Sequence, residues 1–193
     1  AGVSGITGTD KGELAISGVQ IADLTGGLYL VIGILAGLQY VLKNNTGLRL
    51  EVSMFESSLS LIGMHLADFF CGGENPTPAS MRLNGGIPNY RLYQTSDQRW
   101  MSLAPLEGKF WSNFCQAVGK PEWELKLLGS KDEQESLKKD LADLFTCKSF
   151  PEWEKLAQDP DLCLEPVRRF SEIENDPQVK DRGLIQKIKA KDG

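Results

Sequence analysis

The sequence predicts an α/β protein in two parts: a mostly helical first part and a smaller second part with a short sheet. The 193 residues are 41% hydrophobic and 24% charged, which is ordinary for a globular protein. Residues 1–70 hold only three Lys or Arg and six Asp or Glu, whereas residues 71–193 are rich in both signs. A long apolar helical run in the first part precedes a hairpin pattern and amphipathic helices in the second.

The predicted boundaries follow these changes in composition. We expect residues 1–71 to form the end of a larger domain with its linker helix, and residues 90–193 to form a small α/β domain. Residues 72–89 are rich in Gly and Pro and are predicted to be a linker. Residues 1–20, rich in Gly, Ser and Thr, are predicted to be loop and turn.

The first predicted helix follows this loop. Asp23 is a suitable N-cap for a helix that ends near Lys43. Four glycines lie within it, and each weakens a helix by roughly 1 kcal/mol relative to Ala. We therefore expect another helix or a ligand to approach closely. These glycines are Gly26, Gly27, Gly33 and Gly37.

The apolar part of this helix, Leu28 to Leu42, is shorter than the roughly 20 residues needed to cross a bilayer, and it contains Gln39. A buried core helix is therefore favoured over a membrane role. Leu48 to Val52 is predicted to be a short strand or an extended entry. A second apolar helix is predicted to begin at the capping-box pattern Ser53–Glu56 and to run to about Phe70.

The second part is predicted to begin with a hairpin. Its strands are Arg91–Thr95 and Arg99–Leu103, joined by the turn at 96–98. Helices are expected over residues 106–118, from Ser130 to about Phe145, after Ser149 and after Ser171, the last three starting with capping-box spacing. Leu184 to Ile188 alternates and is predicted to be a closing strand.

Composition also excludes some classes of function. The formal net charge of −5 argues against a general nucleic-acid binder. No two of the four cysteines have C-x-x-C spacing and the chain has one histidine, so a zinc site is not predicted. Reduced cysteines in the cytoplasm are the expectation. Residues 1–18 lack the pattern of a signal peptide.

Asp23 is the strongest candidate for chemistry. A carboxylate at a helix N-terminus faces unpaired N–H groups, which stabilise its negative charge. Such a group can act as a nucleophile or a general base, although it can equally be only a cap. Gly26 and Gly27, one turn further on, would let a substrate or a backbone approach.

Other candidates each have a structural alternative. Glu107 can be a glutamate that stabilises a helix start, and the loop at Gly85 and Gly86 can be an interdomain turn. His65 lies in an apolar helix and is better explained as a structural histidine. Three arginines could bind phosphates, although they are not clustered in the sequence. A pair of adjacent arginines can simply be solvated surface residues. These are Arg82, Arg91 and Arg99, and the pair Arg168 and Arg169.

Three ordered blocks closely resemble the class III CoA-transferase family, which includes the α-methylacyl-CoA racemases. The first comprises Gly18 to Tyr29, Thr46-Gly47 and Glu51 to Glu56. The second lies between Asn84 and Trp111, and the third between Glu165 and Gly183. Together they span nearly the whole chain. Because family members are about twice as long, the chain resembles the C-terminal half, and we expect it to be inactive alone.

The resemblance implies a Rossmann-like large domain, a small α/β domain and an interlocked homodimer with its active site between subunits. It places Asp23 at the catalytic aspartate, which forms an aspartyl-CoA thioester in the transferases and is a base on the α-carbon in the racemases. Glu107 matches the glutamate that supports the second base of the racemases. Gly85 and Gly86 match the glycine-rich loop of the transferases.

The resemblance also implies the ligands. A coenzyme A thioester is the substrate, with no cofactor bound covalently in the resting state. The expected partners are an acyl-CoA and, for a transferase, an acceptor carboxylic acid, with no nucleic acid and no membrane. Two alternatives stay open beside CoA transfer: racemisation at C2 of a 2-methylacyl-CoA by aspartate and histidine bases, and a non-catalytic dimerisation module.

Overall fold

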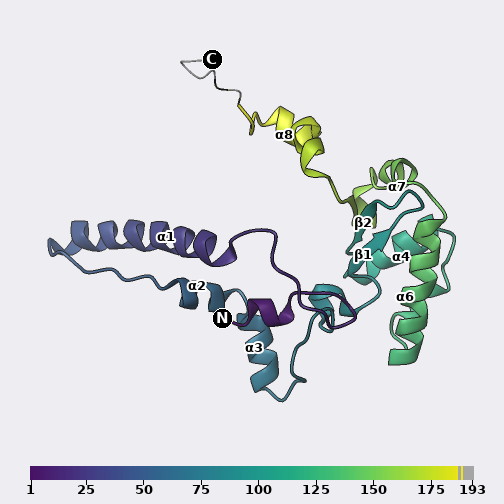
Figure 1. The fold of residues 1–193 in the computed structure, drawn as a ribbon, viewed down its shortest axis with the longest axis horizontal. Helices are drawn as coiled ribbons and strands as arrows, with labels where there is room; N and C mark the ends of the chain where they lie inside the picture. The colour runs from purple at the N-terminus through teal and green to yellow at the C-terminus, as the bar shows by residue number, and fades with distance from the viewer. Residues whose placement is uncertain (187, 189–193) are drawn as a thin grey trace. The chain divides into compact units, whose positions relative to one another are not determined.

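The computed structural model describes residues 1–186 and residue 188 (Figure 1). The chain divides into two compact units, Ala1–Tyr90 and Arg91–Gly193. The first unit contains the 3₁₀ turn η1 (Val3–Ile6), the helices α1 (Ile21–Asn44), α2 (Met54–Ser60) and α3 (Gly63–Phe70), and the π-type turn η2 (Arg82–Gly86). Residues 72–81, part of the predicted linker, belong to this unit and form turns and irregular structure.

Helix α1 begins two residues before the predicted cap. Gln20 occupies the N-cap position, and its carbonyl accepts the first helical hydrogen bond from Leu24 N at 3.0 Å. Asp23 is therefore a residue of the first turn, and the prediction that it caps the helix is wrong. The helix ends at Asn44. Asn45 follows as the C-cap, with a left-handed backbone (φ 51°), and its N–H donates to Val41 O at 2.8 Å.

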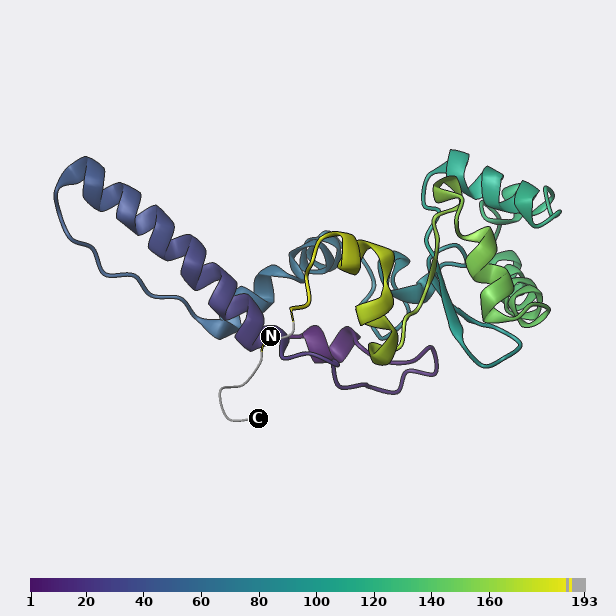
Figure 2. The same ribbon diagram turned by 90° about the horizontal axis from the view of Figure 1, so that it is seen from above.

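The glycines of α1 admit the chain that returns after the helix. A Cβ on Gly33 would lie 2.9 Å from Leu50 Cδ2, and one on Gly37 would lie 3.6 Å from Leu48 Cδ2. Figures 1 and 2 both show this extended segment running back beside α1. The close approach that the glycines predicted is confirmed, and the partner is an extended segment together with α2. Residues 46–53 form no strand.

The rest of the α1 surface is exposed within the chain, so the predicted buried core helix is not buried by the residues that the structure describes. Only Gly26 is buried along its 24 residues. By length and composition α1 could cross a membrane, with a mean hydropathy of 1.8, but a core helix of a soluble protein passes the same test. The returning segment packs along one side of the helix. The other side is exposed within the chain.

The second predicted helix is broken into α2 and α3 at Leu61 and Ile62. Ser53 caps α2 as predicted, accepting a hydrogen bond from Glu56 N at 3.3 Å. Inside α2, Ser57 and Ser58 donate to the carbonyls four residues earlier at 2.7 and 2.8 Å. Such back-bonding competes with the helical ladder and bends helices, which agrees with the early end of α2.

The second unit is built on a three-stranded antiparallel sheet in the order β1 (Arg91–Gln94), β2 (Trp100–Leu103) and β3 (Leu164–Pro166). The predicted hairpin is confirmed, with Gln94 paired to Trp100 across the turn. The third strand was not predicted, and it pairs Leu164 with Leu103 over a separation of about sixty residues. The predicted closing strand is absent: residues 184–186 and 188 are irregular, and residue 187 lies outside the described residues.

Four helices complete this unit: α4 (Gly108–Ala117), α5 (Trp123–Lys126), α6 (Lys131–Thr146) and α7 (Phe150–Leu156). Helices α6 and α7 pack on the sheet, and α5 packs on α4 and α6. They supply an aromatic core in which Phe145 stacks on Tyr93 at 4.9 Å and on Trp153 at 4.4 Å. Burial, with a smaller contribution from the nearby Glu124 and Glu122 carboxylates, raises the pKa of the Cys115 thiol to about 12. All four cysteines are free thiols.

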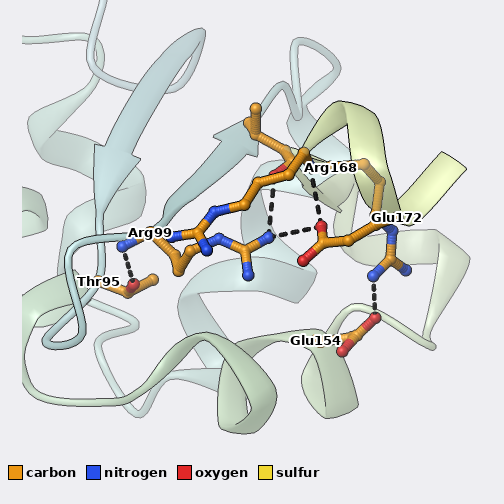
Figure 3. A network of polar contacts seen from close by, with 7 residues as sticks. Thr95, Arg99, Glu154, Arg168 and Glu172 are labelled. Carbon is orange, nitrogen blue, oxygen red and sulfur yellow. Dashed lines mark hydrogen bonds and ion pairs between the residues drawn. The ribbon is translucent and has the colours of Figure 1, made fainter.

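The C-terminal segment continues through η3 (Pro160–Leu162), β3, η4 (Phe170–Asn175) and α8 (Pro177–Asp181). Arg99, just before β2, anchors this segment, as Figure 3 shows. Its Nη2 donates to Glu172 Oε2 at 2.8 Å and to Val167 O at 3.4 Å, and its guanidinium lies 3.8 Å from the centre of the Phe150 ring. A second ion pair joins Arg168 to Glu154.

Candidate functional site

Asp23 lies on a cavity of about 660 Å³ within the first unit. Three parts of the chain form its wall: residues from the N-terminal segment, the first turn of α1, and the start of α2. Most of the lining is apolar, and the larger apolar side chains are those of Val3, Leu14, Ile16, Val19, Ile21, Met54 and Phe55. The cavity is therefore an apolar site with one carboxylate.

The N-terminal segment owes its shape to local hydrogen bonds. Thr9 N donates to Glu13 O at 2.9 Å, and Gly12, with φ at 80°, makes the turn that brings Leu14 opposite Gly8. The segment then leads through Leu14 and Ile16 to the start of α1. A stretch that the sequence predicted to be loop thus supplies much of the cavity wall.

The Asp23 carboxylate is exposed and accepts no hydrogen bond from the residues that the structure describes. It lies in the first turn of a 24-residue helix, where the unpaired N–H groups stabilise negative charge. An exposed carboxylate beside an apolar cavity has the geometry required of a nucleophile or a general base for an apolar substrate.

The two glycines that follow Asp23 have different surroundings. Gly26 is buried, and a Cβ there would lie 3.1 Å from Met54 Cγ, so its lack of a side chain lets α2 pack on α1. Around Gly27 no heavy atom lies within 4 Å of the Cβ position. Of the two, Gly27 is the one that leaves open space for another molecule. A substrate-binding role for either stays a prediction.

The glycine loop at Gly85 and Gly86 does not line the Asp23 cavity, but it is tied to the segment that does. Asn84 Nδ2 donates to Ile6 O at 3.3 Å, at the end of η1. Gly85 has a left-handed backbone, with φ at 104°. A Cβ on Gly86 would lie 2.5 Å from Met81 O, so only glycine fits this turn.

Glu107 belongs to the second unit, whereas Asp23 and the candidate glycines belong to the first. Glu107 occupies the N-cap position of α4, with φ −80° and ψ 142°, and its side chain makes no capping hydrogen bond. The structural alternative to a catalytic role was a glutamate that stabilises the helix start. In the structure its exposed carboxylate does not cap the helix, whereas its backbone carbonyl accepts a hydrogen bond from Trp111 N at 3.1 Å.

The remaining candidates lie elsewhere. His65, on α3, lines a separate cavity of about 550 Å³ with Asp68 and Arg82. Arg99 and Arg168 are engaged in the ion pairs with Glu172 and Glu154 and are not phosphate sites in this structure. Over residues 1–186 and 188, no group of three or more His, Cys, Asp or Glu side chains could hold a metal ion.

Sequence analysis missed the apolar cavity wall. Phe55 and Met54 were assigned only to a helix start, and Leu14 and Ile16 to a loop. An available signal was that large apolar residues, Leu14, Ile16 and Val19 among them, recur in a stretch that is rich in Gly, Ser and Thr. Such residues in a predicted loop favour a surface that contacts a ligand or another chain.

Comparison with known proteins identifies the family. The model of CoA-transferase family III matches residues 1–193, and the chain belongs to this family. It is 28% identical to α-methylacyl-CoA racemase from Homo sapiens, over 92% of this chain and 51% of the relative. It is 25% identical to succinyl-CoA:mesaconate CoA-transferase from Haloarcula hispanica, over 97% of this chain and 47% of the relative.

Solved structures confirm the predicted class III CoA-transferase fold. The crystal structure of a CaiB/BaiF family protein from Brucella suis matches with a TM-score of 0.70 and 20% identity, over 94% of this chain and 49% of that one. The Rv3272 protein of Mycobacterium tuberculosis matches with a TM-score of 0.74 and 17% identity, over 95% and 49%. The chain spans about half the length of the curated relatives it matches.

Proposed function

We propose that Asp23 is the catalytic carboxylate of an acyl-CoA enzyme that transfers coenzyme A between carboxylic acids. The observation that carries the proposal is the exposed Asp23 carboxylate at the start of α1, beside an apolar cavity. Membership of CoA-transferase family III supports the choice of a CoA thioester as substrate. Because the chain covers about half of its relatives, the proposal concerns the complete protein.

The proposed chemistry uses the carboxylate as a nucleophile. An Asp23 oxygen attacks the thioester carbonyl, the C–S bond breaks, and CoA leaves as a thiolate with a mixed anhydride at Asp23. The thiolate then attacks the aspartyl carbonyl of the anhydride, which releases the donor acid as a carboxylate and leaves an aspartyl-CoA thioester. The acceptor carboxylate repeats the two steps in reverse and regenerates the Asp23 carboxylate.

Racemisation at C2 of a 2-methylacyl-CoA is the second candidate. The racemases of Homo sapiens and Mus musculus, at 28% and 27% identity, favour it. Here Asp23 takes or returns the α-proton, which the thioester acidifies, and a histidine acts on the opposite face. Glu107 would support that histidine, and its uncommitted side chain at the start of α4 agrees with such a role.

The resting protein is proposed to hold no covalent cofactor and to act in the cytoplasm as an interlocked homodimer. Gly27 is the proposed point of close substrate approach, and Gly85 and Gly86 are proposed to form a loop near the substrate. An acyl-CoA and, for CoA transfer, an acceptor carboxylic acid are the proposed partners.

Two measurements on the complete protein test this function. Incubation with an acyl-CoA and analysis by intact mass should show a CoA adduct that disappears in Asp23→Asn, if CoA transfer is correct. A racemase should instead exchange the α-hydrogen in D₂O without any acceptor acid. If a broad acyl-CoA panel gives neither signal, or if Asp23→Asn retains full activity, the proposal is wrong.

A further inference from the structure

The Asp23 cavity holds one charged side chain, and that side chain is negative. Apart from Asp23, no described residue that lines the cavity has a charged side chain, and none is Lys, Arg or His. The other polar contributions come from Ser4, Ser17, Gln20 and Ser58, which are uncharged. A second negative group placed in this cavity would meet the Asp23 carboxylate and no cationic side chain of the described wall.

The apolar side chains are free to contact a ligand. Ile16 is 99% exposed and Phe55 is 62% exposed, although both line the cavity. They approach it from two different parts of the chain, the N-terminal segment and α2. Covering such surfaces with hydrocarbon is favourable, whereas stripping water from an unpaired carboxylate is strongly unfavourable.

The cavity volume of about 660 Å³ is within the usual range for small-molecule sites, which runs from about 300 to 1,000 Å³. It is large enough to hold an acyl group of several carbons beside the Asp23 carboxylate. Since the apolar wall and the reactive group share one cavity, the part of the substrate nearest Asp23 should contact that wall.

From these features we infer that the enzyme acts on uncharged hydrocarbon acyl groups and discriminates against acyl groups that end in a carboxylate. This inference rests on the proposed function, because it takes Asp23 as the reacting group. It holds for either branch of that function, because CoA transfer places the acyl carbonyl at Asp23 and α-proton transfer places the adjacent α-carbon there. Phe55 and Ile16 are the specificity-determining residues.

A matched pair of substrates tests the inference on the complete protein. Hexanoyl-CoA and adipoyl-CoA share a six-carbon chain and differ at its far end, which is a methyl group in one and a carboxylate in the other. Consumption of each is followed by CoA transfer to an acceptor acid and by α-hydrogen exchange in D₂O. We expect kcat/KM to be at least tenfold higher for hexanoyl-CoA.

Variants then assign the preference to the cavity. Phe55→Arg adds a cation to the wall and should reduce the hexanoyl-to-adipoyl ratio at least tenfold. Ile16→Arg, on the other part of the wall, is a second test if Phe55→Arg fails to fold. Leu128→Arg is the control, because Leu128 is 84% exposed in the second unit and lines none of the cavities described above. It should leave the ratio unchanged.

The outcomes separate the two ideas. Turnover that depends on Asp23 but is equal for the two thioesters, or faster with adipoyl-CoA, overturns the inference and leaves the proposed function standing. Turnover that survives in Asp23→Asn overturns the proposed function. Turnover of neither thioester, with no adduct and no exchange, overturns both. A ratio that neither arginine variant alters, in folded protein, removes Phe55 and Ile16 as its cause.

Discussion

Arg99 Nη2 donates to Glu172 Oε2 at 2.8 Å, which joins the start of β2 to η4 across 73 residues of the chain (Figure 3). The Arg99 side chain is only 15% exposed, and that of Glu172 is 33% exposed. Arg99 also lies on the Phe150 ring and donates to Val167 O. One guanidinium therefore holds the segment after β3 against the rest of the second unit.

Replacing Arg99 with Met should release this segment. We expect faster amide hydrogen exchange over residues 167–175 and a lower midpoint of urea unfolding, because the charged hydrogen bond and the ring contact are both lost. Glu172→Gln should do the same more weakly, and the two effects should not add in the double variant, because they remove one shared interaction. Lys109→Met, which removes the exposed 3.6 Å pair with Asp161, is the control and should change little. Additive effects would contradict the coupling.

Acid should destabilise the second unit through a defined set of carboxyls. Hydrogen bonds lower the pKa values of three glutamates from their ordinary 4.5. The donors are the Ser130 N–H and hydroxyl for Glu133, the Ser149 hydroxyl and N–H for Glu152, and the Arg169 N–H and the Arg99 guanidinium for Glu172. A lowered pKa in the folded state gives stability that is present above the unfolded value and is lost as the pH falls through the folded value. We expect unfolding free energy, measured by urea titration, to fall below about pH 4.5 and Glu152→Gln to flatten that fall. An unchanged slope in the variant would exclude Glu152 as a contributor.

The second unit shows how far local signals reach. Ser130 and Ser149 were predicted as helix starts from residues three positions apart, and both capping boxes are present. The hairpin was likewise predicted from strands that adjoin one turn. Strand β3 and the Arg99–Glu172 pair were not predicted, because each joins residues more than sixty positions apart and depends on how the intervening helices pack.

The candidate site was predictable only in part for a related reason. Asp23 was proposed as a candidate because a carboxylate near a helix start can be recognised from the local sequence. The cavity wall needs Phe55 from α2 and Ile16 from the N-terminal segment to meet, which no periodicity encodes. The exposure of α1 was also unpredictable. Apolar composition indicates that a helix is buried against other residues, but it does not identify those residues.

The glycines of α1 should respond differently to the same substitution. Gly27→Ala meets no atom within 4 Å and should stabilise the helix by up to about 1 kcal/mol, the difference in helix propensity. At Gly33 the new Cβ would lie 2.9 Å from Leu50 Cδ2, so the returning segment must shift and most of that gain should be lost. Thermal unfolding of the two single variants in the complete protein compares them. Equal stabilisation by both would show that the returning segment does not pack on Gly33 in solution.

Glu107→Gln separates a functional carboxylate from a structural one. Because the Glu107 side chain makes no capping hydrogen bond in α4, its amide replacement should leave the unfolding free energy of the protein unchanged. If it supports a base in proton transfer, α-hydrogen exchange should fall at least about tenfold, within the range that general acid–base groups contribute. Glu133→Gln is the matched control: it removes a true capping-box glutamate, bonded to Ser130 N at 2.7 Å, and should lower stability without altering exchange. Loss of stability in Glu107→Gln with normal exchange would make Glu107 a helix-start residue and remove it from the site.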